Sequence, residues 1–383
     1  MKTSHSLLKQ LSKQIKNNEA FLISDPNSLK YFANCETLLP EEREAYLIIN
    51  PQQSYIIQSS FSPKNNHKNI KTLFGMSASK VKQNLELILK ELNLKILYID
   101  KNSLFISEYE NLQSIKSLKL KSLDKKIIWD LRSIKNKKEK IKIKKACQIT
   151  KQVLKEVIKN LQEGVTELEI KREIIKNFYA LGADGEAFPT IVAFAANSAL
   201  PHHQPLDSPS TSSGTSNVSP ILRPNMPVLI DCAAMYEGYR ADMTRTIWFG
   251  DKPSEKFLEI EKIIMAAYKA ALAKLNKPSP LGRGHLVSAK QNQIGEARAQ
   301  DLDNAARSVI STAGYASEFI HSTGHGIGLE VHEPPSLNSR NTMPIKPGMV
   351  ITIEPGIYLE NQFGYRYENT VLVKEKGVEE LTR

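Results

Sequence analysis

The sequence has no long hydrophobic run and very little cysteine. No stretch of about eighteen apolar residues occurs in the chain, so we expect no membrane span. The polar N-terminus, MKTSHSLLKQLSKQIKNN, lacks the apolar segment that a signal peptide requires. The three cysteines, Cys35, Cys147 and Cys232, are odd in number and widely separated. This spacing excludes a disulfide framework and predicts a reducing, cytoplasmic location.

Aromatic residues are nearly absent from the most basic part of the chain. The formal net charge is +11, and much of it comes from residues 121–145, where Trp129 is the only aromatic ring. A nucleic-acid surface would place rings among its basic side chains, because bases stack on them. We therefore expect a solvated, lysine-rich segment between domains and no nucleic-acid partner.

Composition and length indicate a globular protein with two domains. Hydrophobic residues make up 41% of the 383 residues and charged residues 24%. Strands are expected at 20–24, 45–50, 54–58 and 95–100, and helices at 2–17 and 78–92. Their alternation predicts an α/β domain over residues 1–123. A charged linker at 124–138 follows.

The remaining residues, 139–383, predict an α+β domain with an antiparallel sheet. Thr166 and Glu169 have the spacing of a capping box at the start of one of its helices. The expected helices are 139–160, 166–181, 254–274 and 299–313, the expected strands are 188–194, 349–354 and 365–373, and a hairpin is expected at 228–249. Two polar tracts, 208–219 and 278–293, lack the apolar surface to pack, so we expect mobile surface insertions. The first joins His202 to Asp231, so an active-site lid is its alternative interpretation.

Five side chains suggest a metal centre. Asp231 and Asp242 lie in VLIDCAAMYEGYRADMTRTIWF, where a hairpin would bring the two carboxylates together. The pair alone is ambiguous, because aspartate is common at strand ends. Downstream lie His325, Glu354 and Glu368, in HSTGHGIGLEVHE, ITIEPG and YRYENTVLV. Four carboxylates, one imidazole and no thiolate disfavour structural zinc and suit two hard divalent cations, with Mn²⁺ the best match.

Two further features of the sequence predict the local structure around His325 and Glu368. His321 and His325 have the spacing of a helical zinc site, but Gly324 and Gly326 argue against a helix. We expect a loop or strand in which glycines let the backbone approach the metals. On a strand, Arg366 would share a face with Glu368. It would then hold a carboxylate or meet a substrate carboxylate, unless it is a surface arginine on an edge strand.

With these motifs in view, the chain resembles the pita-bread metallopeptidases, in the Xaa-Pro aminopeptidase and prolidase branch. The resemblance runs through FLISDPNSLKYF, WDLRSIKNKKE, FPTIVAF, NSALPHH and the motifs quoted above, and the N-terminal part is also similar to creatinase. It implies a creatinase-like α/β N-terminal domain and an α+β catalytic domain with a curved antiparallel sheet. We also expect a homodimer.

The resemblance implies a role for each site residue. Asp231 would bind one metal ion, Asp242 and Glu368 would bridge both ions, and His325 and Glu354 would bind the other. Mn²⁺ is the first expectation, and Co²⁺, Fe²⁺ or Zn²⁺ are alternatives. His202 and His332 match catalytic histidines, although neighbouring His203 leaves the first assignment open. His321 and Arg366 match residues of the substrate pocket. Glu354 is also the candidate to move the proton of a metal-activated water.

The chain departs from the family pattern at two turns. Phe194-Ala195-Ala196 stands where Ser/Ala-Gly-Pro is usual, which affects the pocket wall. Asn225-Met226-Pro227 replaces a Gly-Asp turn, and asparagine can adopt the left-handed conformation that this turn needs. Neither departure touches a ligand.

The expected activity is that of an Xaa-Pro aminopeptidase, which hydrolyses the bond before a proline at the second position of a peptide. The sequence does not separate this activity from that of an Xaa-Pro dipeptidase, and it does not show the preferred first residue. A methionine aminopeptidase shares the five ligands but typically lacks a domain like residues 1–123. A creatinase-type enzyme or a non-catalytic peptide- or protein-binding module would have lost ligands, and none is missing here.

Overall fold

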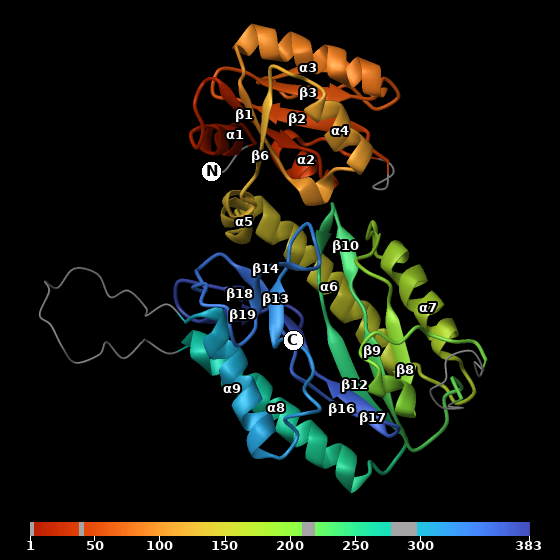
Figure 1. The fold of residues 1–383 in the computed structure, drawn as a ribbon. Helices are drawn as coiled ribbons and strands as arrows, with labels where there is room; N and C mark the ends of the chain where they lie inside the picture. Colours follow the sequence, from red (N-terminus) through yellow and green to blue (C-terminus); the bar gives the residue numbers. More distant parts are fainter. Residues whose placement is uncertain (1–3, 38–41, 209–218, 277–296) are drawn as a thin grey trace, which may run out of the picture. The chain divides into compact units, whose positions relative to one another are not determined.

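The protein consists of two compact units, Met1–Arg132 and Ser133–Arg383 (Figure 1). The computed structural model describes residues 4–37, 42–208, 219–276 and 297–383, so the centres of the two predicted insertions lie outside the described residues. The segment expected as a linker contains helix α5 (Lys126–Ser133) and the start of α6 (Lys137–Lys159). None of the described helices has the length and apolar character needed to cross a bilayer.

The first unit is the expected α/β domain. A mixed sheet has the strand order β4-β3-β2-β1-β5-β6. Every residue of the three strands β1, β2 and β3 is buried. The strands are β1 (Glu19–Ile23), β2 (Ala45–Ile49), β3 (Ser54–Gln58), β4 (Ile70–Phe74), β5 (Ile96–Ile99) and β6 (Lys119–Ser122). The helices are α1 (Ser4–Ser12), α2 (Pro26–Ala33), α3 (Ala78–Leu92) and α4 (Ile106–Gln113), with a short 3₁₀ turn η1 (Lys101–Ser103).

The second unit begins with two long helices packed on antiparallel strands. Helices α6 and α7 (Glu167–Ala180) share an apolar core with the β8-β9-β12 sheet. The predicted capping box is present, because Glu169 N–H donates to Thr166 Oγ1 at 3.2 Å and Thr166 N–H to Glu169 Oε2 at 2.8 Å. The strands here are β7 (Gly185–Glu186), β8 (Ile191–Phe194), β9 (Met226–Asp231), β10 (Ala234–Tyr236), β11 (Tyr239–Arg240) and β12 (Thr244–Phe249), with the 3₁₀ turn η2 (Ala195–Ala199) after β8.

The rest of the second unit repeats this layering with other elements. Helices α8 (Glu255–Asn276) and α9 (Ala299–Thr312) lie side by side and share a core with the remaining strands (Figure 1). All strand pairs in the unit are antiparallel within the described residues, as predicted for the α+β domain. The strands are β13 (Gly324–Gly326), β14 (Glu333–Leu337), β15 (Val350–Ile353), β16 (Gly356–Leu359), β17 (Phe363–Arg366), β18 (Asn369–Val373) and β19 (Val378–Glu380).

The predicted hairpin at 228–249 is present, and the predicted strand at 365–373 is divided. The segment 228–249 forms β9 and β12, paired with Asp231 opposite Thr244, and the small hairpin β10-β11 lies between them. The segment 365–373 forms β17 and β18, which pair with different partners, β16 and β15. The break falls at Tyr367, whose N–H donates to Pro355 O. The sequence predicted that Arg366 and Glu368 share one strand face. This prediction is wrong, because Arg366 ends β17 and Glu368 lies between β17 and β18.

Candidate metal centre

One cavity of about 710 Å³ is lined by all nine site residues predicted from the sequence. Their side chains come from strands and from the segments between them, which are far apart in the chain. Thr370 ties β18 to the start of β12, since its Oγ1 accepts from Asp242 N–H at 3.0 Å and donates to Asp242 O at 2.8 Å. The nine residues are Asp231, Asp242, Glu354, Glu368, His202, His321, His325, His332 and Arg366.

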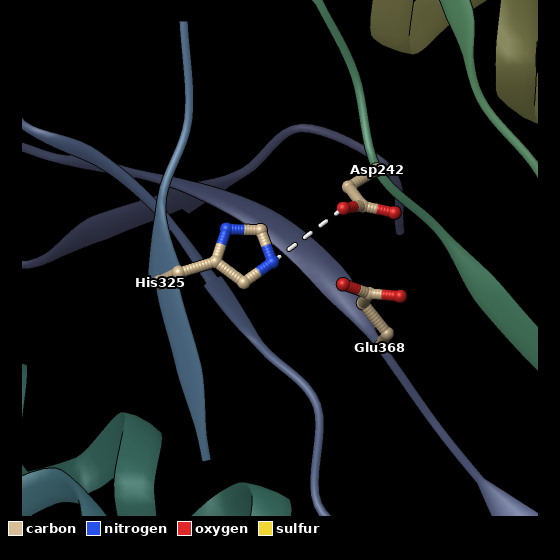
Figure 2. A group of neighbouring side chains, drawn as sticks. All are labelled: Asp242, His325 and Glu368. Atoms are coloured by element: carbon tan, nitrogen blue, oxygen red, sulfur yellow. Dashed lines mark ion pairs between the residues drawn. The ribbon is translucent and has the colours of Figure 1, made fainter. Parts of the chain in front are cut away.

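Asp242, His325 and Glu368 form the tightest group of potential ligands (Figure 2). One ligand atom from each lies within 4.8 Å of the others. Nε2 of His325 is 3.7 Å from Asp242 Oδ2 and 3.2 Å from Glu354 Oε1. Its Nδ1 is 3.0 Å from the carbonyl of Gly326, so Nδ1 carries the proton and donates there. Nε2 is therefore the nitrogen that faces the carboxylates: it donates to Glu354 when the imidazole is protonated, and it would offer its lone pair to a metal ion after losing that proton.

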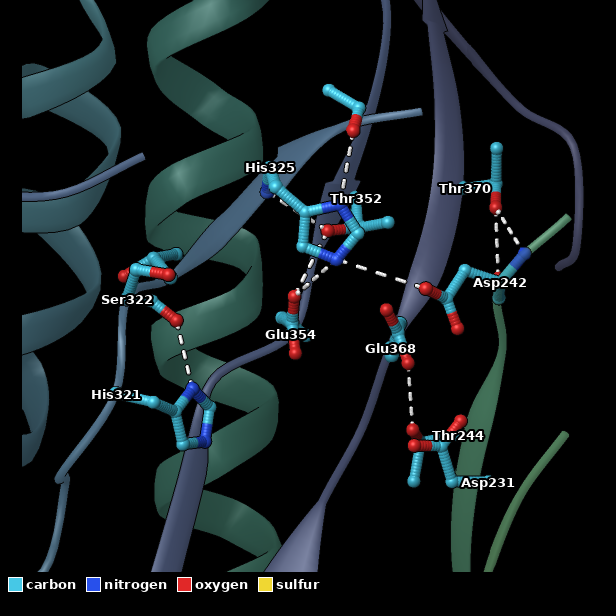
Figure 3. Close-up of polar contacts among 12 residues, drawn as sticks. Asp231, Asp242, Thr244, His321, Ser322, His325, Thr352, Glu354, Glu368 and Thr370 are labelled. Atoms are coloured by element: carbon cyan, nitrogen blue, oxygen red, sulfur yellow. Dashed lines mark hydrogen bonds and ion pairs between the residues drawn. The ribbon is translucent and has the colours of Figure 1, made fainter. Parts of the chain in front are cut away.

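Arg366 links two of the carboxylates, Asp231 directly and Glu368 through Thr244. Its Nη2 donates to Asp231 Oδ2 at 2.6 Å, and its Nε donates to Thr244 Oγ1 at 3.0 Å. The Thr244 hydroxyl in turn donates to Glu368 Oε2 at 2.6 Å (Figure 3). The two carboxylates accept these hydrogen bonds through Asp231 Oδ2 and Glu368 Oε2. The other oxygens, Asp231 Oδ1 and Glu368 Oε1, are buried and have no hydrogen-bond partner among the described residues.

The electrostatics of this cluster fit a cation. Burial, together with the neighbouring carboxylates, raises the pKa of Asp242 and the pKa of Glu368 well above their usual values. Burial also raises the pKa of Asp231, although Arg366 opposes this. Buried like charges and unpartnered oxygens are costly, and a divalent cation relieves both costs. The oxygen-rich donor set therefore fits divalent metal ions.

Glu354 differs from the other three carboxylates. Burial alone would raise its pKa, but the hydrogen bond with His325 and the charges of His325, His321 and Arg366 lower that pKa to about 2. Thr352 also donates to Glu354 Oε1 at 3.0 Å. Glu354 is therefore the carboxylate of the cluster that stays ionised most readily without a metal.

His202, His203 and His332 differ in whether they line the cavity. His202 and His332 line the cavity, and His332 lies edge-on to His325 with ring centroids 4.5 Å apart. Burial and the nearby His325 lower the pKa of His332. His203 faces away from the cavity and pairs with buried Glu167 at 2.7 Å. The ambiguity between the two adjacent histidines is thus resolved in favour of His202 as the cavity residue.

His321 is held by a residue that the sequence analysis missed. Its Nδ1 donates to Ser322 O at 2.8 Å, so Nε2 accepts from the Tyr358 hydroxyl at 2.9 Å. The same hydroxyl accepts from Arg366 Nη1 at 2.7 Å. Burial raises the pKa of Tyr358 to about 12, so the hydroxyl keeps its proton. Tyr358 lies in the ITIEPGIYL motif, but nothing in the apolar pattern there marks it as polar and inward-facing.

The glycines around His325 serve strand packing. Residues 324–326 form strand β13 and not a helix, as predicted. A Cβ on Gly324 would lie 2.2 Å from Thr352 O, and a Cβ on Gly326 would lie 2.4 Å from Pro334 O. These glycines therefore allow a close approach to strands β15 and β14, and the expectation that they let the backbone approach the metals stays a prediction.

Both turns that depart from the family pattern adopt left-handed backbone. Asn225 has φ 64°, as predicted for the turn before β9. Ala195, where glycine is usual in the family, has φ 44°. A residue with a Cβ pays a steric cost there that glycine does not.

Known proteins are similar to this one over most of the chain. Residues 141–375 match the metallopeptidase family M24. The chain belongs to this family. An Xaa-Pro dipeptidase of Pyrococcus furiosus is 38% identical to this M24 protein over 282 residues, which are 73% of this chain and 72% of the relative.

Two solved structures extend the similarity to the whole M24 chain. The prolidase of Pyrococcus horikoshii OT3 has a TM-score of 0.83 and 29% identity, covering 99% of this chain and 98% of that one. An X-Pro aminopeptidase of Thermotoga maritima has a TM-score of 0.78 and 29% identity, covering 97% of each chain. The predicted two-domain pita-bread fold is confirmed. The family also implies divalent metal ions as cofactors.

Proposed function

We propose that this M24 metallopeptidase hydrolyses Xaa-Pro dipeptides. The proposal is carried by one observation: a donor set for metal ions and the histidines His202 and His332, which are not predicted ligands, line the same cavity. Its volume of about 710 Å³ suits a short peptide, because pockets for small molecules span roughly 300–1,000 Å³. Similarity to an Xaa-Pro dipeptidase favours dipeptides over the longer peptides expected from the sequence.

The five ligands divide into two groups around the shared carboxylates. We assign Asp231 to one cation, His325 and Glu354 to the other, and Asp242 and Glu368 to both. The contacts of His325 with Asp242 and Glu354, and of Asp231 with Arg366, support this division. Oxygen ligands favour Mn²⁺. When bound, the cations supply an activated water and polarise the peptide carbonyl.

Glu354 is assigned to proton transfer as well as to metal binding. In the metal-free site its hydrogen bond with His325 contributes to its low pKa. As a carboxylate beside the water that the cations would activate, Glu354 can accept a proton from that water and pass it on.

His332 and His202 are assigned to the substrate. The lowered pKa of His332 keeps its imidazole neutral near pH 7, so one ring nitrogen can donate a hydrogen bond and the other can accept one. The bond to be cleaved joins the carbonyl of the first residue to the ring nitrogen of proline, and this nitrogen must gain a proton when the bond breaks. A neutral imidazole at the cavity wall can relay that proton.

Arg366 and His321 are assigned to the frame of the site. Nε, Nη1 and Nη2 of Arg366 each donate to a protein oxygen, which leaves the guanidinium committed to Asp231, Thr244 and Tyr358. His321 is committed to Ser322 and Tyr358 through its two nitrogens. Of the two active-site roles considered for Arg366, these contacts support the holding of a carboxylate.

A peptide panel tests the function. Purified protein is stripped of metal, loaded with Mn²⁺ and assayed with Ala-Pro, Ala-Pro-Gly, Pro-Ala and Ala-Ala. We expect kcat/KM for Ala-Pro to exceed that for Ala-Pro-Gly by about 10-fold or more, since each differential contact of 1.4 kcal/mol contributes that factor. Pro-Ala and Ala-Ala are the controls. Preference for Ala-Pro-Gly supports an aminopeptidase, in keeping with the Thermotoga maritima structure. No hydrolysis of either Xaa-Pro peptide contradicts the proposal.

Two further properties belong to the proposal. We infer a cytoplasmic location, which the three cysteines support, because all of them are free and buried. We also infer a homodimer, as expected from the sequence resemblance. Light scattering on the purified protein measures its mass directly.

A further inference from the structure

Glu167 is a buried carboxylate outside the metal centre that faces the segment carrying His202. It is the first residue of α7, and its side chain is 0% exposed. Oε1 accepts from Phe194 N–H at 2.8 Å and from Asn197 Nδ2 at 2.9 Å. Oε2 lies 2.7 Å from His203 Nε2 and accepts from Leu206 N–H at 3.2 Å. One carboxylate thus holds four points of the segment 194–206.

His202 depends on this segment for its position. Within the described part of the chain, no hydrogen bond fixes the His202 imidazole, and the residue lies in an irregular stretch between η2 and β9. Two further hydrogen bonds from distant residues anchor the segment, from Gly364 N–H to Ser198 Oγ at 2.9 Å and from Leu168 N–H to Leu206 O at 3.3 Å. Consecutive side chains of non-helical backbone point in different directions. Anchoring His203 inward therefore directs His202 toward the cavity.

We propose that Glu167 is a positioning residue for His202. Its carboxylate holds His203 and the ends of the segment, and this fixes the direction in which the His202 imidazole enters the cavity. The role in catalysis rests on the proposed function, but the positioning itself does not.

The charge and shape of Glu167 suit this role. A carboxylate has only acceptor oxygens and here faces four N–H donors, and the first turn of a helix favours a negative charge. Glutamine has the same shape but places an NH₂ group where one oxygen stood. That group would meet the N–H of Leu206 and the imidazole of His203 with a donor, so at least one hydrogen bond is lost.

A double-mutant cycle with His202 tests the proposal. We expect Glu167→Gln to lower kcat/KM for Ala-Pro by about 10-fold, with Mn²⁺ content unchanged, because a displaced His202 loses part of its contribution to proton transfer. In a His202→Ala background, the same change should cost less than about 2-fold, because the residue it positions is gone. Equal losses in both backgrounds, or a loss of bound Mn²⁺, overturn the proposal.

Glu169→Gln is the matched control. Glu169 lies on the same helical turn and bonds to Thr166, but it faces solvent. This variant weakens the start of α7 but removes no contact with segment 194–206. We therefore expect kcat/KM within about 2-fold of the wild-type value. A loss in Glu169→Gln equal to that in Glu167→Gln means that helix stability explains both and contradicts positioning.

A second measurement needs no activity. In protein labelled with ¹³C-histidine, the His202 resonance is identified by its disappearance in His202→Ala. We expect Glu167→Gln to shift and broaden this resonance while the His325 resonance stays in place. If Glu167→Gln does not fold, His203→Phe keeps a ring but removes the donor, and the same shift is expected. An unchanged His202 resonance overturns the proposal. A protein inactive on Xaa-Pro peptides that still shows the shift refutes only the proposed function.

Discussion

Arg366 donates from Nη2 to Asp231 Oδ2 at 2.6 Å, although both side chains are buried in the cavity wall. Burial would lower the pKa of Arg366, but Tyr358 and the surrounding carboxylates raise that pKa well above its usual value. The guanidinium therefore keeps its charge and fixes one oxygen of Asp231. The other oxygen is left to bind a cation.

Arg366→Gln is expected to weaken metal binding. Without the guanidinium, Asp231 loses a hydrogen bond and a neutralising charge, and Thr244 loses the donor that orients it toward Glu368. We expect the apparent affinity for Mn²⁺ to fall by about 10- to 100-fold, measured by titration of the metal-free protein. If affinity is unchanged while KM for Ala-Pro rises, Arg366 contacts the substrate carboxylate instead.

His332→Ala is expected to separate catalysis from metal binding. His332 lies beside His325 but does not belong to the group of potential metal ligands. The amount of bound Mn²⁺ should therefore stay near that of the wild-type protein. We expect kcat/KM for Ala-Pro to fall by about 10²-fold, the scale for losing a group that donates or accepts a proton. A parallel fall in metal content, measured by mass spectrometry of the metals, would make His332 a ligand or a support for one.

The metal-free protein is expected to lose stability as pH rises. Unfolded carboxyl groups titrate near pH 4. In the fold, burial and neighbouring charges raise the pKa of Asp242 and that of Glu368 well above 3.8 and 4.5, their usual values. Between the unfolded and folded values, the native state binds more protons, so its free energy of unfolding decreases with increasing pH.

Urea unfolding across that range, in chelator and in saturating Mn²⁺, measures this effect. Mn²⁺ binds the ionised carboxylates and should stabilise the protein more at higher pH. Asp242→Asn removes one titrating group and should flatten the slope in chelator. A metal-free protein that gains stability throughout this range would show that the cluster is not strained by its charges.

Ala195→Gly is expected to stabilise the protein. Ala195 has φ 44°, where a Cβ is unfavourable and glycine is not. The gain from relieving this strain exceeds the entropy that glycine adds to the unfolded chain, and we expect a net gain of ~0.5 kcal/mol. Ala196→Gly is the control, because Ala196 does not have positive φ and should only lose stability. Urea unfolding of both variants decides the sign.

The candidate site could be predicted from the sequence because its residues are of types that metals select. Asp231, Asp242, His325, Glu354 and Glu368 lie in short motifs that each combine a chemical group with strand or glycine patterning. Their convergence on one cavity was an expectation that the fold fulfils. The N-cap at Thr166 and the left-handed turn at Asn225 were predictable for local reasons, since each depends on its own few residues.

What the sequence did not predict depends on contacts between distant segments. Strands β4 (IKTLF) and β6 (KLKS) were missed because they are sheet edges with lysine side chains and little burial. The separation of β17 from β18 follows from their different partners, which no local pattern encodes. The roles of Tyr358 and Glu167 likewise depend on hydrogen bonds to residues that are distant in the sequence.

The most direct test of the two-cation site is a titration of metal-free protein with Mn²⁺, following Ala-Pro hydrolysis and bound metal together. The account predicts that the rate reaches its maximum when two ions are bound per chain. It also predicts that Asp242→Ala, which lacks a shared ligand, binds less metal and loses activity by orders of magnitude. Full hydrolysis by the metal-free protein, or a maximum rate with one ion bound, would contradict it.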